Sequence, residues 1–172
     1  MTRPQLEHII RAAAANADVR DIVVIGSQSV LGSTPNPPIE LTVSMEADVF
    51  PLDASDRSIL IDGAIGELSL FHETFGYYAH GVDEMTAVLP DGWRDRLVRV
   101  ETAGTMGAVG WCLEPNDLAV SKLAAGREKD FAFVDVMIAV EIATLRIINA
   151  RIKQTGRLDD ASRTRLLARL KG

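Results

Sequence analysis

The spacing of apolar residues predicts strands in the first two thirds of the chain and helices in the last third. Apolar residues at helical spacing in 3–16 predict an opening helix. Residues 21–25, rich in β-branched side chains, predict a buried strand that ends at Gly26. Residues 27–31 can begin a helix before a proline-rich loop, and the next strand is expected over 39–50. The chain therefore opens with alternating helix and strand.

The elements expected after residue 50, taken with those before it, predict one α+β fold with a small mixed sheet. A helix is expected around 55–65, and strands are expected near 87–89, 97–101 and 109–113. Pro115 and the acids beside it predict a helix that runs to Ala125, and 127–148 has the pattern of one long apolar helix. We expect a core over 1–113 and a C-terminal helical part over 114–172 within the same compact unit.

Composition narrows the class of protein. The 172 residues are 47% hydrophobic and 24% charged, which is typical of one globular domain with a real core and excludes a disordered chain. The single cysteine, Cys112, excludes an intramolecular disulfide and a cysteine zinc site. The most apolar stretch, 131–148, holds three charged residues, too many for a membrane span. We expect a cytoplasmic protein.

Charge is distributed unevenly along the chain. The formal net charge is −6, which argues against binding nucleic acid by charge alone. Residues 151–172, however, hold seven basic and two acidic residues, and an amphipathic helix is expected there with Arg163, Arg165, Arg169 and Lys171. Such a helix either packs on the acidic core with a solvated face or meets a phosphate backbone or acidic partner.

Two short motifs could carry chemistry. Glu46 and Asp48 alternate along the expected strand, so both carboxylates lie on one face, about 6.5 to 7 Å apart along it. They could converge on Mg²⁺, which prefers oxygen ligands and often keeps phosphates in its shell. Gly26-Ser27 follows the first strand, where a glycine lets a phosphate approach backbone amides and Ser27 Oγ.

Together these motifs resemble a known superfamily. Gly26-Ser27, followed by Glu46-Ala47-Asp48, resembles the signature of DNA polymerase β-like nucleotidyltransferases. Downstream, Lys122-Leu123 and Arg127-Glu128-Lys129-Asp130 resemble segments of the DUF6036 family of nucleotidyltransferase-like proteins, which is distantly related to AbiEii-type toxin nucleotidyltransferases. The likeness covers most of 8–135.

The resemblance implies a nucleotidyltransferase-type small mixed sheet with flanking helices, and it implies roles for particular residues. Gly26 and Ser27 would hold the triphosphate, Glu46 and Asp48 would bind the metal ion, and Lys122 would steady the nucleotide. Asp130 would complete the catalytic site. Lys129 would join the nucleotide-binding group if the helix continues through Gly126; the alternative is a helix that breaks there.

Three features depart from the family pattern. Glu46 stands where an aspartate is usual, the loop between Gly26-Ser27 and the acid pair is longer, and a third strand carboxylate is not obvious. Glu101 is the best candidate for that third carboxylate, although it also fits an ordinary exposed acid at a strand end. These departures leave open a catalytically silent member of the family.

The histidines and aromatic residues have two interpretations each. His72 and His80 could bind a metal or act as an acid/base pair, but more often such residues are packed or hydrogen-bonded loop groups. The aromatic residues near them could stack on a base or pack a core; they are Phe71, Phe75, Tyr77 and Tyr78.

The leading functional hypothesis is metal-dependent transfer of a nucleotidyl group from an NTP to a hydroxyl, with Mg²⁺ as the cofactor. The acceptor would be RNA, such as a tRNA, or a protein, and the protein could be the toxin-like member of a bacterial toxin–antitoxin or defence pair. The alternative is a silent module that binds a nucleotide or a partner. An antitoxin or a second copy of the chain could dock on the apolar 131–148 helix.

Overall fold

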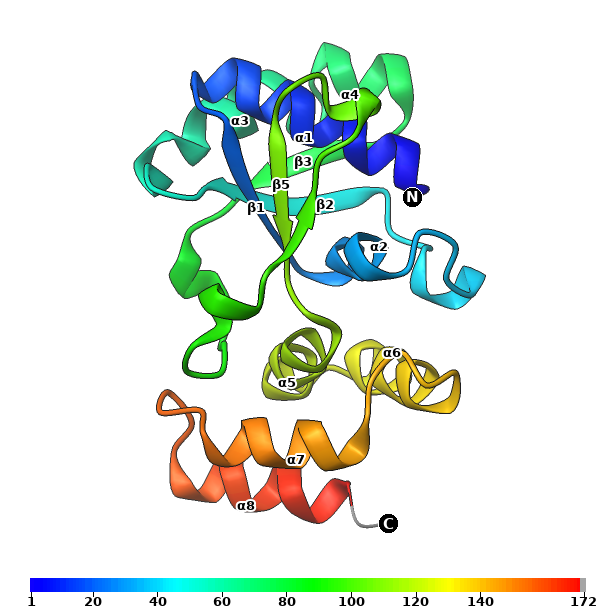
Figure 1. The fold of residues 1–172 in the computed structure, drawn as a ribbon, viewed down its shortest axis with the longest axis vertical. Helices are drawn as coiled ribbons and strands as arrows, with labels where there is room; N and C mark the ends of the chain where they lie inside the picture. Colours follow the sequence, from blue (N-terminus) through cyan, green and yellow to red (C-terminus); the bar gives the residue numbers. More distant parts are fainter. Residues whose placement is uncertain (171–172) are drawn as a thin grey trace.

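Five strands form one mixed sheet in the order β3-β2-β1-β5-β4. The computed structural model describes residues 1–170 (Figure 1). The strands are β1 (Asp21–Ile25), β2 (Glu46–Pro51), β3 (Tyr78–Gly81), β4 (Val98–Val100) and β5 (Val109–Cys112). β1 runs antiparallel to β2 and parallel to β5, β2 is parallel to β3, and β4 is antiparallel to β5. The α+β class and the mixed sheet are confirmed.

Some helices cover the sheet, and the others form a group beyond one end of its strands. The helices are α1 (Arg3–Ala17), α2 (Val30–Ser33), α3 (Ser58–Ile65), α4 (Leu70–Phe75), α5 (Pro115–Ala125), α6 (Glu128–Ala139), α7 (Leu145–Lys153) and α8 (Asp160–Arg169). α1 and α3 contact each other and the sheet, whereas α5 to α8 stack together beyond its other end (Figure 1). None of the helices in residues 1–170 is both long and apolar enough to cross a bilayer.

The helix expected over 127–148 is two helices, and the prediction of one was wrong. Glu141 has a left-handed backbone, with φ of 60°, which ends the helical path after α6. The Asn116 side chain then accepts a hydrogen bond from the Thr144 amide at 2.8 Å, just before α7 begins. Both α6 and α7 pack on α5, so much of the apolar surface of this segment is buried against the chain's own helices.

Two of the expected strands also differ. Residues 39–41 form a short 3₁₀ turn, and the strand begins only at Glu46, because the N-terminal amine binds the carbonyls of Thr42 and Ser44. Residues 87–89 form no strand, because the Arg157 guanidinium holds the Ala87 carbonyl at 2.6 Å. In both segments, donors from elsewhere in the chain satisfy backbone carbonyls that a neighbouring strand would otherwise satisfy.

The basic tail is largely tied into the fold. The Arg163 guanidinium of α8 donates to three carbonyls, those of Lys153, Thr155 and Leu158. Arg169 lies over the Phe131 ring, 4.1 Å from its centroid, and pairs with Asp135. Arg165 is exposed, and Lys171 lies outside the described residues. Because Arg163 and Arg169 are engaged within the helical part, the structure favours a packed basic helix over a free phosphate-binding surface.

Candidate metal and nucleotide site

Glu46 and Asp48 share a face of β2 with two side chains from the neighbouring strand. In the parallel register, Tyr78 lies beside Glu46 and His80 lies beside Asp48. The Tyr78 hydroxyl donates to Glu46 Oε2 at 2.9 Å, and His80 Nδ1 lies 3.3 Å from Glu46 Oε1 and 3.4 Å from Asp48 Oδ1. One ligand atom from each of Glu46, Asp48 and His80 falls within 4.8 Å of the others. This is a three-residue cluster of metal-ligand atoms.

The turn after β1 packs directly against Asp48. β1 and β2 are antiparallel with Ile25 opposite Asp48, so Gly26 follows at the same edge. Gly26 has φ of 71°, and a Cβ placed there would lie 2.1 Å from Asp48 Oδ2. Only glycine combines a ready positive φ with the absence of a Cβ, so this position requires glycine. Ser27 is half-buried and opens a single 3₁₀ turn that leads directly into the four-residue α2, so the helical segment expected from Ser27 is present with a 3₁₀ first turn.

A cleft of about 170 Å³ separates this edge of the sheet from the helical part. The sheet side contributes Gly26 and Asp48, and the helical side contributes Lys122 and Arg127. Segment 86–88 closes a third side. The structure therefore brings together the glycine turn, the second acid and the helix lysine that the sequence singled out.

Asp130 is buried behind this cleft, between two cations. It is 1% exposed, and its carboxylate accepts from Lys122 Nζ at 3.0 Å and from Arg127 Nε at 2.6 Å. Burial alone would raise the pKa of Asp130, but the hydrogen bonds from Arg127 and Lys122 outweigh burial and hold that pKa below its usual value. Lys122 Nζ also lies over the Phe133 ring, 5.2 Å from its centroid.

The two acids on β2 repel each other. Burial, followed by the charge of Glu46, raises the pKa of Asp48 to about 6. Burial, followed by the hydrogen bond to Glu46, raises the pKa of Tyr78 to about 12, so its hydroxyl stays protonated and donates. Two carboxylates and an imidazole that converge in this way are donors suited to a divalent cation, which would relieve their repulsion. The residues present therefore fit a metal ion.

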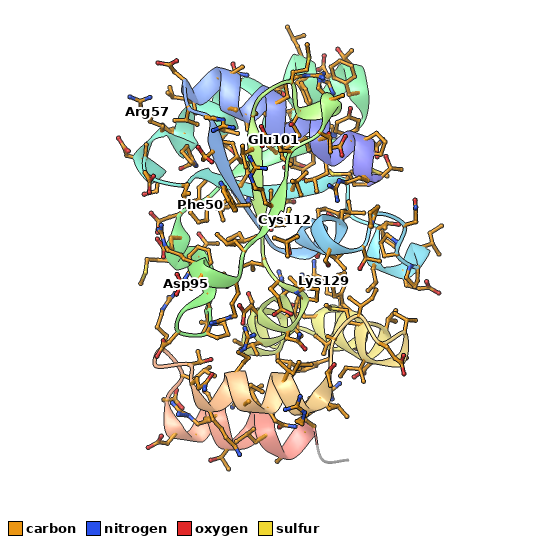
Figure 2. The ribbon with its side chains drawn as sticks, viewed as in Figure 1. Phe50, Arg57, Asp95, Glu101, Cys112 and Lys129 are labelled. Atoms are coloured by element: carbon orange, nitrogen blue, oxygen red, sulfur yellow. The ribbon has the colours of Figure 1, made fainter. Side chains whose placement is uncertain are left out.

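Two sequence candidates lie elsewhere. The helix breaks at Gly126, which has φ of 73°, and Lys129 is exposed in the first turn of α6 (Figure 2). Arg127, two residues earlier, lines the cleft. Glu101 follows β4 on the α1 side of the sheet and pairs with Arg20 at 3.1 Å. Glu101 is exposed at the end of β4, which runs away from the site, and this agrees with its interpretation as an ordinary strand-end acid.

The sequence alone did not assign His80, Tyr78 or Arg127 to the site. The sequence leaves His80 open as a metal ligand, but its pattern does not predict β3, the strand that places His80 beside Asp48. The other histidine of that pair, His72, lies on α4, where its Nδ1 accepts from the Leu68 amide at 3.1 Å. A useful signal was the alternation of Tyr78 and His80, which matches that of Glu46 and Asp48.

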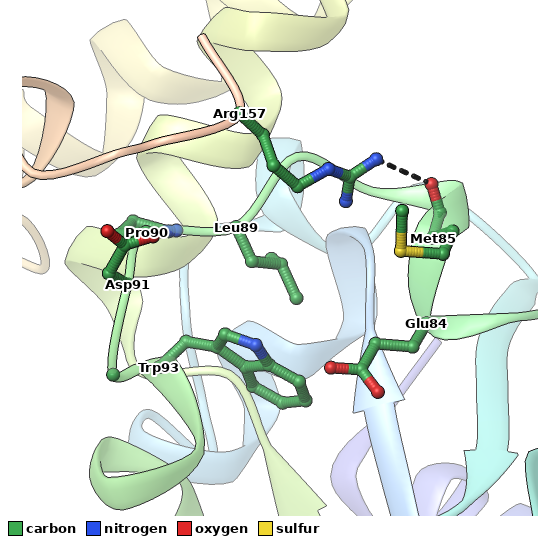
Figure 3. A pocket seen from close by; sticks show the side chains of 8 residues that line it. Glu84, Met85, Leu89, Pro90, Asp91, Trp93 and Arg157 are labelled. Atoms are coloured by element: carbon green, nitrogen blue, oxygen red, sulfur yellow. Dashed lines mark hydrogen bonds between the residues drawn. The ribbon is translucent and has the colours of Figure 1, made fainter.

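A second cavity, of about 290 Å³, lies on the other side of segment 84–89 (Figure 3). Its wall includes Leu89 and the Trp93 ring, with Glu84 and Asp91 adding carboxylates. Arg157 crosses its mouth and donates to the Met85 carbonyl at 3.1 Å. One segment thus lines both hollows, with 86–88 facing the cleft.

Comparison with known proteins gives one match. The model of a family described as "Nucleotidyltransferase of unknown function (DUF6036)" matches residues 4–168. Neither the curated proteins nor the solved structures that were compared give a match. The family match spans both walls of the cleft and confirms the resemblance that the Gly-Ser and Glu-x-Asp motifs indicate. The chain belongs to the DUF6036 family of nucleotidyltransferases of unknown function.

Proposed function

We propose that the protein transfers a nucleotidyl group from an NTP to a hydroxyl acceptor with the help of a divalent metal ion, Mg²⁺ being the ion expected with the nucleotide. The contact between Gly26 and Asp48 carries the proposal. This contact places the Gly26 turn, which a phosphate can approach closely, next to the Asp48 carboxylate. That carboxylate can hold the metal ion that accompanies the phosphate. Lys122 faces the same point across the cleft.

Each residue has a role in binding or orientation. The Gly26-Ser27 turn would bind phosphate oxygens through its amides and the Ser27 hydroxyl. Glu46 and Asp48 would hold the metal ion, which when bound neutralises charge on the phosphates. Lys122 would contact the nucleotide phosphates as a point charge, with Asp130 fixing its position. Positioning and charge stabilisation supply most of the catalysis in phosphoryl-type transfer.

We propose RNA, such as a tRNA, or a protein as the source of the acceptor hydroxyl. The second cavity supports an approach from the side of segment 84–89, because the same segment lines both this cavity and the cleft. A transferase that modifies RNA or protein could serve as the toxin-like member of a bacterial toxin–antitoxin or defence pair.

A transfer assay tests this function. Each α-³²P-labelled NTP is incubated with Mg²⁺ or Mn²⁺ and with total bacterial RNA or protein. The wild type is compared with Glu46→Gln/Asp48→Asn, and Glu101→Gln serves as the matched control because Glu101 lies away from the site. We expect label on one acceptor class, lost in the double variant and kept in the control. Absence of label with every NTP, from a folded protein, would contradict the proposal.

One observation favours the silent binding module as a second candidate. Asp130 already engages both Lys122 and Arg127, so the cations of the cleft are paired before a nucleotide arrives. In that case a partner protein or second copy would dock at the α6–α7 turn, where Val140 and Leu145 are 43% and 41% exposed. Nucleotide or partner binding without label transfer, with partner binding unchanged in Glu46→Gln, would support the module.

A further inference from the structure

His80 projects into the candidate metal centre from a strand that carries neither of the two acids. β3 is an edge strand, and its parallel register with β2 sets His80 beside Asp48. We propose that His80 is the third protein ligand of this centre, which therefore prefers a first-row transition ion such as Mn²⁺ over Mg²⁺. The inference rests on the proposed role of Glu46 and Asp48 in holding the ion.

The distances suit coordination of one ion. Ligand atoms on neighbouring corners of an octahedron with bonds of about 2.1 Å lie about 3.0 Å apart. His80 Nδ1 lies 3.3 Å from Glu46 Oε1 and 3.4 Å from Asp48 Oδ1. A shift of a few tenths of an ångström would bring the nitrogen to the corner next to each oxygen. The same nitrogen faces both oxygens.

The neighbouring groups orient the two carboxylates. Tyr78 donates to Glu46 Oε2, which leaves Oε1 turned toward His80. Asp48 Oδ2 faces Gly26, which leaves Oδ1 turned toward His80. Each acid thus presents one oxygen to a shared point. Outer partners that fix ligand orientation in this way are typical of metal sites.

A nitrogen ligand changes which ion the centre favours. Mg²⁺ prefers carboxylate, carbonyl and water oxygens, whereas imidazole suits the first-row transition ions. An oxygen-only centre of Glu46 and Asp48 would not make that distinction strongly. His80 adds it, and because its side chain is 52% exposed, the imidazole can adjust without disturbing the core.

The same distances would also fit an imidazolium ion paired with two carboxylates. In that case His80 neutralises the acids and competes with the metal, so its removal would strengthen metal binding. If His80 is a ligand, its removal weakens Mn²⁺ binding more than Mg²⁺ binding. The two roles therefore predict opposite changes.

The test measures metal binding without turnover. Calorimetry gives the affinities of the full chain for Mn²⁺ and Mg²⁺, and pulsed EPR of the Mn²⁺ form detects an imidazole nitrogen bonded to the ion. His80→Gln offers an oxygen in place of the nitrogen. His72→Gln is the matched control, because the His72 ring packs against Tyr78 in a tilted arrangement, 4.6 Å between ring centroids, without joining the three-residue cluster. Glu46→Gln/Asp48→Asn tests whether the ion binds at this centre.

We expect a nitrogen signal in the wild type and in His72→Gln and its loss in His80→Gln. The Mn²⁺ affinity of His80→Gln should fall by about tenfold or more, the scale on which even outer partners of a metal affect binding. Bound Mn²⁺ without a nitrogen signal, or a signal that survives in His80→Gln, would overturn the inference and leave the proposed function standing. Absence of binding of either ion to the folded wild type would overturn both.

Discussion

Asp130→Asn should destabilise the protein strongly while leaving the three candidate metal ligands in place. Asp130 is 1% exposed and is the common partner of Lys122 and Arg127. The amide keeps the size of the carboxylate but removes its charge, so Lys122, itself 9% exposed, loses its ionic partner. Asp130 contacts these two cations and lies outside the Glu46–Asp48–His80 cluster, so the substitution removes no candidate ligand of the metal ion.

The magnitude follows from burial of the pair. Removing one member of a buried ion pair costs about 3 to 5 kcal/mol. We expect the lower end, about 3 kcal/mol, because Arg127 is 59% exposed and water can solvate it. For a chain of this length each kcal/mol lowers Tm by about 2 to 4 °C, so Tm should fall by about 6 to 12 °C.

Urea and thermal unfolding measure this loss, and a control exists on the same helix. Asp135 of α6 pairs with Arg169 at 3.3 Å, but its side chain is 65% exposed. Asp135→Asn should cost less than about 0.5 kcal/mol, because exposed pairs contribute little. A cost of Asp130→Asn below about 1 kcal/mol would refute the reasoning, since it would mean that Lys122 does not depend on this partner.

Three further predictions concern the site and its surroundings. Gly26→Ala should cost more stability and metal affinity than Gly76→Ala in calorimetry, because both glycines have φ above 70° but only a Cβ at Gly26 would meet Asp48; equal effects would contradict this. Metal affinity should fall as pH drops below about 6, because the pKa of Asp48 is raised to about 6, chiefly by burial, and its proton competes with the ion. A titration with Mn²⁺ from pH 5 to 8 checks it, and a flat profile would count against it. Cys112, fully buried with a pKa raised by burial to about 12, should react with a thiol reagent only after unfolding; labelling of the folded protein would be the contrary result.

Local patterns predicted the elements that their own residues determine. The β-branched run at 21–25 forms β1, and the Glu114-Pro115 start gives α5, because the Glu114 side chain caps the Asn116 and Asp117 amides. Alternation along β2 put Glu46 and Asp48 on one face. These outcomes need only neighbours in sequence.

Contacts between distant segments decided the rest. The break between α6 and α7 depends on the Asn116 side chain, 28 residues before Thr144. The loss of a strand at 87–89 depends on Arg157, which belongs to the helical part. His80 reaches the candidate centre only because β3 pairs with β2 in one register, and a slip of one residue would turn its side chain to the other face.

The charge balance of the cleft connects the metal with the nucleotide. Glu46 and Asp48 on β2 and Asp130 behind the cleft carry three negative charges when ionised, whereas Lys122 and Arg127 carry two positive charges, so these five groups together have an excess of one negative charge. That excess repels a triphosphate. A divalent ion on the β2 acids turns the balance to one positive charge and makes the same cleft attractive to phosphate. Nucleotide should therefore bind weakly to the metal-free protein and tightly once the ion is present, and calorimetry with a non-hydrolysable NTP, with and without Mn²⁺, measures the difference. Equal affinity in both states would mean that Lys122 and Arg127 bind phosphate without the ion, and the ion would then serve only the transfer step.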